Sequence, residues 1–115
     1  MIRKITVSTG IITTVAGGGR LTAVDNIAAT RSTLNYPTDV AVDTFGNIYI
    51  ADSGDHRIRK VTASTGIITS ITGDNSTYAN GIPPLPMLGV AATASSFPSP
   101  TGVFVDMSGN LFFTE

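Results

Sequence analysis

The side chains of this sequence that could do chemistry are a few acidic residues, one histidine and a short basic run. Asp52 and Asp55 stand close together, and the sole histidine, His56, follows directly. Their spacing is unlike that of a calcium-binding loop, so we interpret the segment as a turn. A nucleophile–histidine pair would need His56 beside Ser53 or Ser64 with an orienting acid, which neighbours on a hairpin do not provide. We therefore expect no catalytic residue and no cofactor.

Two further aspartates recur at the same place in two similar segments. Asp43 precedes Gly46, and Asp106 precedes Gly109 in the same way. A metal site would need converging acidic and amide ligands, and the chain has a single glutamate, Glu115. A residue that recurs in each unit more readily serves the unit itself. We predict that each aspartate bonds the amides of its own turn and that no metal is bound.

The basic run Arg57, Arg59 and Lys60 recurs as Arg3 and Lys4, and it could form a stripe for RNA. Seven basic and eight acidic residues give a net charge of −1, so the chain lacks the basic field that nucleic acid needs. We therefore interpret the run as a solvated face. The chain has no cysteine, and no apolar run approaches the roughly 18 residues of a membrane-spanning helix.

The chain repeats itself twice. Residues 2–17 match residues 58–73 at an offset of 56, with eleven of sixteen positions identical, and residues 37–48 match residues 100–111 at an offset of 63. Tandem similarity of this kind indicates repeated structural units that stack and bury the apolar faces of their neighbours. We divide the chain into strands three and four of one unit (1–17), a connection (18–36), a complete unit (37–73), a long proline-rich connection (74–99) and strands one and two of the next unit (100–115).

Alternating hydrophobicity and turn residues predict the strands. Gly10 can supply the positive φ of a tight hairpin. The segment 48–51 is apolar on both faces, which predicts burial between two layers. Ile58 and Val61 break simple alternation, which a bulge would explain. Strands are predicted at 2–5, 11–16, 39–43, 48–51, 56–62, 67–72, 103–106 and 111–114.

The connections carry fewer signals. In the first one, we expect Asp25 to cap a helical turn over residues 27–31. Leu34 and Tyr36 are expected to pack over the next sheet, and Tyr36 and Tyr49 to pack between units. In the second connection, Asn75 begins a triplet that fits an N-glycosylation site.

The complete unit resembles a known family, the NHL repeat. The resemblance is carried by Pro37-Thr-Asp-Val-Ala-Val-Asp, Gly46-Asn-Ile-Tyr-Ile-Ala-Asp and His56-Arg-Ile-Arg-Lys. The trailing Gly-Ile-Ile-Thr and the Ala-Ala-Thr connection are similar to the longer, teneurin-type repeats. Those repeats usually carry Gly-Asp-Gly-Gly-Pro-Ala, where this chain has Val24-Asp-Asn-Ile-Ala-Ala. The resemblance implies that His56 is the repeat's usual residue of strand three.

NHL repeats are blades of a β-propeller, so the resemblance implies an all-β chain of four-stranded antiparallel sheets. It would hold one complete blade flanked by two half blades, with residues 40–42 innermost and residues 67–72 outermost. Family propellers usually have six blades. Three interpretations stay open: a fragment of a longer protein, which we prefer; self-assembly, in which three copies supply six blades; and a short monomer with exposed blade faces.

The resemblance favours a non-enzymatic scaffold that binds a protein or a small ligand on the face with the longest connections. The alternative is a fragment of a six-bladed propeller enzyme, lactonase- or lyase-like, whose catalytic residues lie outside this chain. Nucleic acid is not an expected partner, and exposed blade faces could self-associate. The sequence does not fix the compartment, and we favour an extracellular or membrane-attached parent. The candidate partner-binding residues are Arg20, Arg31, Asp55, His56 and Tyr78.

Overall fold

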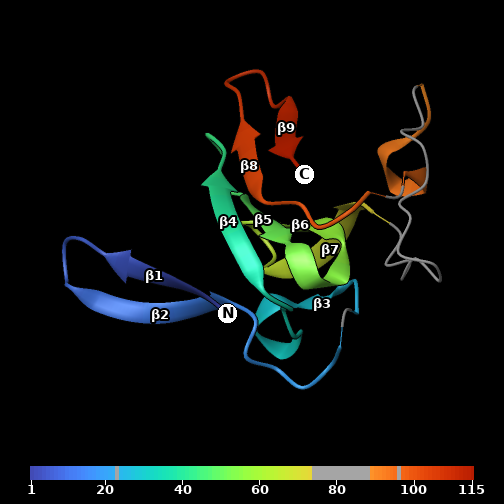
Figure 1. Cartoon of the computed structure of the whole chain (residues 1–115). Helices are drawn as coiled ribbons and strands as arrows, with labels where there is room; N and C mark the ends of the chain where they lie inside the picture. Colours follow the sequence, from blue (N-terminus) through green and yellow to red (C-terminus); the bar gives the residue numbers. More distant parts are fainter. Residues whose placement is uncertain (23, 74–88, 96) are drawn as a thin grey trace.

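The computed structural model describes residues 1–22, 24–73, 89–95 and 97–115 (Figure 1). These residues form antiparallel β-sheets and three short 3-10 turns, with no α-helix among them. The 3-10 turns span Ala29–Arg31, Ser53–Asp55 and Ala92–Ala94. The strands are β1 (Ile2–Thr6), β2 (Ile11–Ala16), β3 (Ile27–Ala28), β4 (Pro37–Val42), β5 (Ile48–Asp52), β6 (Arg57–Val61), β7 (Ile67–Thr72), β8 (Gly102–Val105) and β9 (Leu111–Thr114).

The central sheet is the complete unit that the sequence predicted. Its strands lie in the order β3-β7-β6-β5-β4, all antiparallel, and β1–β2 and β8–β9 form separate two-stranded hairpins. The chain is therefore all-β, with one complete blade-like sheet flanked by two half sheets. Strand β3 was not predicted. It pairs with the outer edge of β7, where Ile27 lies opposite Ile68.

Both faces of the central sheet are covered, as the two-sided apolar pattern of β5 predicts. On one face Ile50 packs in a cluster with Ala16 of the first hairpin. On the other face Tyr49 and Ala51 pack in a cluster with Val103 of β8. The layers on either side come from the two half sheets and their connections. Successive side chains of a strand point to opposite faces, so a strand between two layers is buried on both of its faces.

The irregularity predicted for the third strand lies instead in the fourth strand, β7. Arg59 pairs with Ser70, but Ile58 pairs with Thr72, so the register between β6 and β7 shifts between Ile58 and Arg59. The extra residue is therefore Ile71 of β7, while β6 pairs with β5 without a shift. Ile58 and Val61 are three residues apart, so alternation alone places them in the core clusters on opposite faces.

The interpretation of the basic run as a solvated face was wrong. The Arg59 side chain is 0% exposed, and Arg57 is buried as well. Lys60 is half-buried, with its Nζ 5.5 Å from the centre of the Tyr49 ring. The sheet is enclosed on both faces, so cationic side chains of β6 lie inside it, whereas Arg3 and Lys4, their counterparts in the first hairpin, are exposed.

Two expectations about the first connection were also wrong. Asp25 caps no helical turn, because the 3-10 turn begins after Ala28 with no side-chain cap, and the Asp25 carboxylate bonds Arg59 instead. Tyr36 does not pack over the sheet, since its side chain is 81% exposed and its φ is 49°. Leu34 is half-buried and packs against a core cluster, as expected.

Candidate functional site: a buried charge cluster beneath the loop face

The first and second connections both end at the turn Ser53–Asp55, at one edge of the central sheet. Residues 26–29 of the first connection lie at the other end of β7, where the N–H of Ala29 donates to the Gly66 carbonyl (2.9 Å). We call residues 18–22, 24–36, 52–56 and 97–100 together the loop face. The backbone N–H of Asn35 donates to Asp52 Oδ1 (2.7 Å), and Asn35 Nδ2 donates to Asp55 Oδ1 (3.1 Å). The N–H of Gly54 donates back to the Asn35 carbonyl (2.8 Å). These bonds fix the first connection onto the turn that follows β5.

The second connection ends on the same turn. The carbonyl of Pro100 accepts hydrogen bonds from Thr38 Oγ1 (3.1 Å) and from Ser53 Oγ. The two hydroxyls are also 2.8 Å apart. Segments from three regions of the sequence therefore share one rigid edge of the sheet, which is the placement that loops on a scaffold need for binding.

Beneath the loop face lies a cluster of buried charges centred on Arg59. Its Nη2 donates to Asp25 Oδ1 (2.9 Å) and to the Val24 carbonyl (3.0 Å), and its Nη1 lies 3.7 Å from Asp52 Oδ2. Ser70 Oγ donates to Asp25 Oδ1 (3.0 Å) and accepts from Arg57 Nη1 (3.0 Å). The cluster ties β6 and β7 to the connection that precedes the sheet.

The electrostatics of the cluster are dominated by desolvation. Burial raises the pKa of Asp52 from 3.8 to about 6, and the negative charge of Asp55 adds to this rise. The backbone N–H of Asn35 and the cations Arg59 and Arg57 act in the opposite direction. Raised carboxyl pKa values occur in catalytic sites, but structural ion-pair networks produce them too. Asp52 is fully buried, and its partners come from the sheet and the first connection, so the geometry points to a structural network.

The structure brings together two of the predicted binding residues. Arg20 and Arg31 are exposed on neighbouring segments, because the N–H of Gly19 donates to the Ser32 carbonyl (3.2 Å) and that of Leu21 to the Arg31 carbonyl (3.3 Å). Two positive side chains thus share one part of the loop face.

The other predicted residues are placed differently. Asp55 is buried, so its carboxylate serves the turn. His56 is half-buried and ends the 3-10 turn in the left-handed conformation (φ 53°), so the expectation that it belongs to strand three was wrong. Tyr78 and the Asn75 triplet lie outside the described residues. Sequence reasoning missed exposed Tyr36, because an aromatic residue beside a strand is more often packed, and no local signal marks this one as exposed.

The recurring aspartates each hold a hairpin turn. Asp43 Oδ1 accepts from the N–H groups of Phe45 (2.9 Å) and Asn47 (2.8 Å), and Asp106 Oδ1 accepts in the same pattern within its own turn. Partial desolvation raises the pKa of Asp43, but hydrogen bonds from Asn47 and Tyr49 outweigh it and leave that pKa below its ordinary value. For Asp106, a hydrogen bond from the Asn110 side chain is the main cause of a lowered pKa. Both carboxylates thus have a structural role, because their hydrogen bonds hold their own turns.

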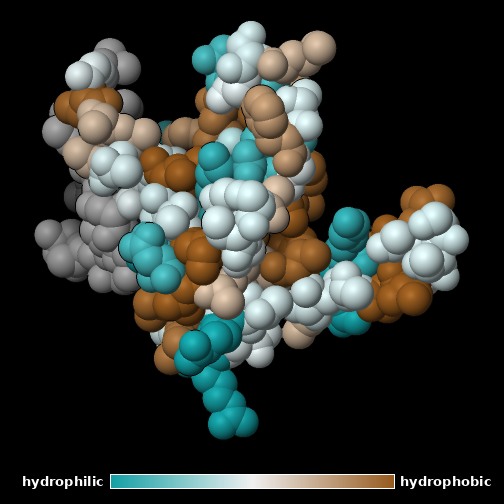
Figure 2. Space-filling model, turned by 180° about the vertical axis from the view of Figure 1, so that it is seen from behind, coloured by the Kyte–Doolittle hydropathy of each residue, from teal (hydrophilic) through white to brown (hydrophobic). Residues whose placement is uncertain are grey.

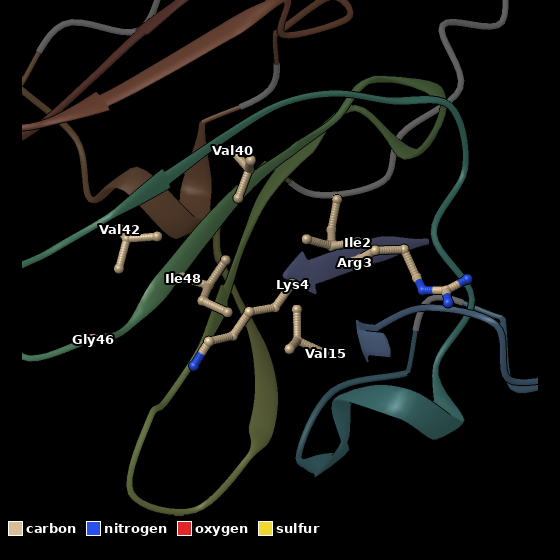
Figure 3. A pocket seen from close by; sticks show the side chains of 8 residues that line it. All are labelled: Ile2, Arg3, Lys4, Val15, Val40, Val42, Gly46 and Ile48. Atoms are coloured by element: carbon tan, nitrogen blue, oxygen red, sulfur yellow. The ribbon is translucent and has the colours of Figure 1, made fainter. Parts of the chain in front are cut away.

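An apolar groove of about 320 Å³ lies between the first hairpin and the central sheet (Figure 3). Val40, Val42 and Ile48 form its wall on the central sheet, and Ile2 and Val15 form its wall on the hairpin. Its lining is mostly aliphatic, with Arg3 and Lys4 as its charged members, so it suits a largely apolar occupant.

The family model of the NHL repeat matches residues 34–61, which hold β4, β5, the Ser53–Asp55 turn and β6. The match supports assignment of this unit to the NHL-repeat family, in agreement with the sheet described above. No curated protein matches the chain. Among the described residues, none of the helical segments has the length and apolar character needed to cross a membrane.

Proposed function

We propose that this chain is part of a non-enzymatic NHL-type β-propeller with teneurin-like long repeats, and that the propeller binds a protein or a ligand on its loop face. The observation that supports a scaffold is that the titratable groups and the exposed side chains of that face are different residues. The titratable groups that converge there, Asp52, Arg59 and Asp25, are bonded to one another within the sheet and its connection. Exposed side chains of the same connection include Arg20, Arg31 and Tyr36.

The chemistry of this surface favours a macromolecular or anionic partner. Aromatic residues and arginines are the side chains that most often anchor protein interfaces, because each combines a large apolar area with hydrogen-bond donors. The shared hydrogen bonds of Asn35, Ser53 and Thr38 hold the backbone of this face in place before a partner arrives. A preorganised surface loses less conformational entropy on binding.

The test uses the parent protein and the partners that it retains in affinity purification. The triple variant Arg20→Ala, Arg31→Ala, Tyr36→Ala removes exposed side chains from the loop face. A double variant, Thr44→Ala with Phe45→Ala, changes exposed residues of the turn between β4 and β5, at the end of these strands away from Ser53–Asp55, and is the matched control. We expect the triple variant to lose at least about tenfold of its retained partner, with the control unchanged. Equal retention by both variants would overturn the proposal.

The enzymatic alternative has its own readout. A six-bladed lactonase- or lyase-like parent would carry converging metal ligands on the inner strands of blades outside residues 1–115. Turnover of a lactone or of a peptidyl-hydroxyglycine substrate by the parent would contradict the non-enzymatic proposal directly.

A further inference from the structure

The buried charge cluster contains polar atoms that have no protein hydrogen-bond partner among the described residues. They include Asp52 Oδ2, Asp55 Oδ2 and, on Arg59, Nη1 and Nε. Other atoms of the same groups are engaged, since Asn35 donates to Asp52 Oδ1 and to Asp55 Oδ1, and Arg59 Nη2 donates to Asp25. Buried polar groups of folded proteins are almost always hydrogen-bonded, either to protein or to ordered water. These atoms therefore indicate a partner that is not a protein group.

The atoms are enclosed by this chain itself. The side chains of Asp52 and Arg59 are 0% exposed, and Asp55 is buried as well. Exposure on the projecting first hairpin, where Figure 2 shows hydrophobic side chains, is different, because residues that adjoin the hairpin in a longer protein could cover it. No such residue could reach Asp52 Oδ2 or Arg59 Nη1 without displacing the groups that bury them. The partner must be small enough to lie inside the cluster.

The distance between Asp52 and Arg59 shows where this partner lies. Arg59 Nη1 is 3.7 Å from Asp52 Oδ2, which is too long for a direct hydrogen bond of about 2.9 Å. The same distance is too short for a third group on the line between the two atoms. A polar separation of this length is often bridged by a water molecule. An atom at hydrogen-bond distance from both lies beside the pair, at the third corner of a triangle.

The carboxylate of Asp55 is held beside that of Asp52. Asn35 joins the two, because its backbone N–H donates to Asp52 Oδ1 (2.7 Å) and its Nδ2 donates to Asp55 Oδ1 (3.1 Å). The negative charge of Asp55 also contributes to the raised pKa of Asp52, as expected for neighbouring carboxylates. The second oxygen of each carboxylate is the one without a protein partner.

The mixture of donors and acceptors selects the kind of partner. The guanidinium of Arg59 opposes a cation, and the two carboxylates oppose an anion. A water molecule can donate to both carboxylates and accept from the guanidinium, and buried waters make about three hydrogen bonds. We propose that the cluster binds one internal water, which donates to Asp52 Oδ2 and Asp55 Oδ2 and accepts from Arg59 Nη1.

This water would tie the turn Ser53–Asp55 to strand β6. The turn carries part of the loop face, and Asn35 and the Pro100 carbonyl already hold it from the two connections. The water adds an attachment from beneath, inside the sheet. The site belongs to the fold of the sheet, so it holds whether or not the loop face binds a partner.

Crystals of the parent protein grown with rubidium bromide as the only salt test the site directly, because Rb⁺ and Br⁻ scatter anomalously and water does not. We expect one ordered peak without anomalous signal, within hydrogen-bond distance of Asp52 Oδ2, Asp55 Oδ2 and Arg59 Nη1. An anomalous peak at that place would overturn the proposal. So would the absence of any peak beside these three atoms.

A second measurement counts long-lived internal waters in solution by magnetic relaxation dispersion of water oxygen-17. Asp52→Leu keeps roughly the size of the side chain but removes both oxygens, so we expect the parent protein to lose one long-lived water. Asp52→Asn is the matched control, because its amide still offers the water a hydrogen bond, and we expect its count to stay unchanged. Equal counts in the unaltered protein and Asp52→Leu, or the same loss in both variants, would contradict the proposal. If Asp52→Leu does not fold, the crystals of the unaltered protein decide.

Discussion

Replacement of Arg59 by methionine tests whether the buried charge cluster holds the central sheet to its connection. Methionine keeps most of the volume and the apolar stem of the side chain but removes the guanidinium. The Asp25 carboxylate then loses its bond at 2.9 Å, and Asp52 loses its nearest positive charge at 3.7 Å. Two carboxylates stay beneath the loop face without the cation that stood between them.

The expected loss follows from burial. Removal of one partner of a buried ion pair destabilises a protein by about 3–5 kcal/mol. The Asp25 side chain is 34% exposed, so water screens part of its charge, and we expect the lower end of that range at pH 7. At pH 5 the loss should be smaller. Asp52 has a pKa of about 6, and the loss of Arg59 raises that pKa further, so the carboxyl binds a proton and no longer needs a cation.

The assay is urea unfolding of residues 1–115 followed by far-UV circular dichroism, at pH 7 and at pH 5. The matched control is Arg20→Met, which makes the same chemical change at an exposed position. Exposed substitutions of this kind change stability by about 0.5 kcal/mol or less. A loss for Arg59→Met no greater than that of the control at pH 7 would refute the argument. A loss that grows as the pH falls would refute its electrostatic part.

Two further predictions concern the same sheet. Asp52→Asn should flatten the pH dependence of stability. In the unaltered chain the folded-state pKa of Asp52 is raised from 3.8 to about 6. The folded chain therefore gains stability as the pH falls through 6 towards 4, by at most about 3 kcal/mol. Unfolding free energies of both chains across that range check this, and parallel curves would contradict it. Gly73→Ala should cost at least about 2 kcal/mol more than Gly10→Ala in the same assay. Both glycines have positive φ, but a Cβ on Gly73 would lie 2.2 Å from the His56 carbonyl oxygen, while nothing lies within 4 Å of one on Gly10; equal losses would show that the close approach is not real.

The framework could be predicted because its signals are local or repeated. The two-sided hydrophobicity of β5 and the spacing of Ile58 and Val61 each follow from side-chain alternation, which a short stretch of sequence displays. The repeats at offsets of 56 and 63 then place equivalent strands in equivalent positions. For this part of the chain the order of β4 to β7 was accessible without coordinates, whereas the bulge lies in β7 and not in the strand for which it was predicted.

The charge cluster was not accessible in that way. The charge of Arg59 argues for exposure, and its burial depends on Asp25, which is distant in the sequence and has a local alternative as a helix cap. Tyr36 was predicted to pack because it adjoins a strand, but its left-handed backbone turns it outward. Both errors arise where a tertiary partner or a backbone conformation overrides a local preference.

The most direct test of the account is amide hydrogen exchange of residues 1–115, resolved to single strands. The account places β5 and β6 at the centre of a sheet that is covered on both faces. It therefore predicts that amides such as those of Ile50 and Ile58 exchange most slowly and together. Faster exchange in β5 and β6 than in the two hairpins would contradict the description of residues 37–72 as a complete, enclosed propeller blade.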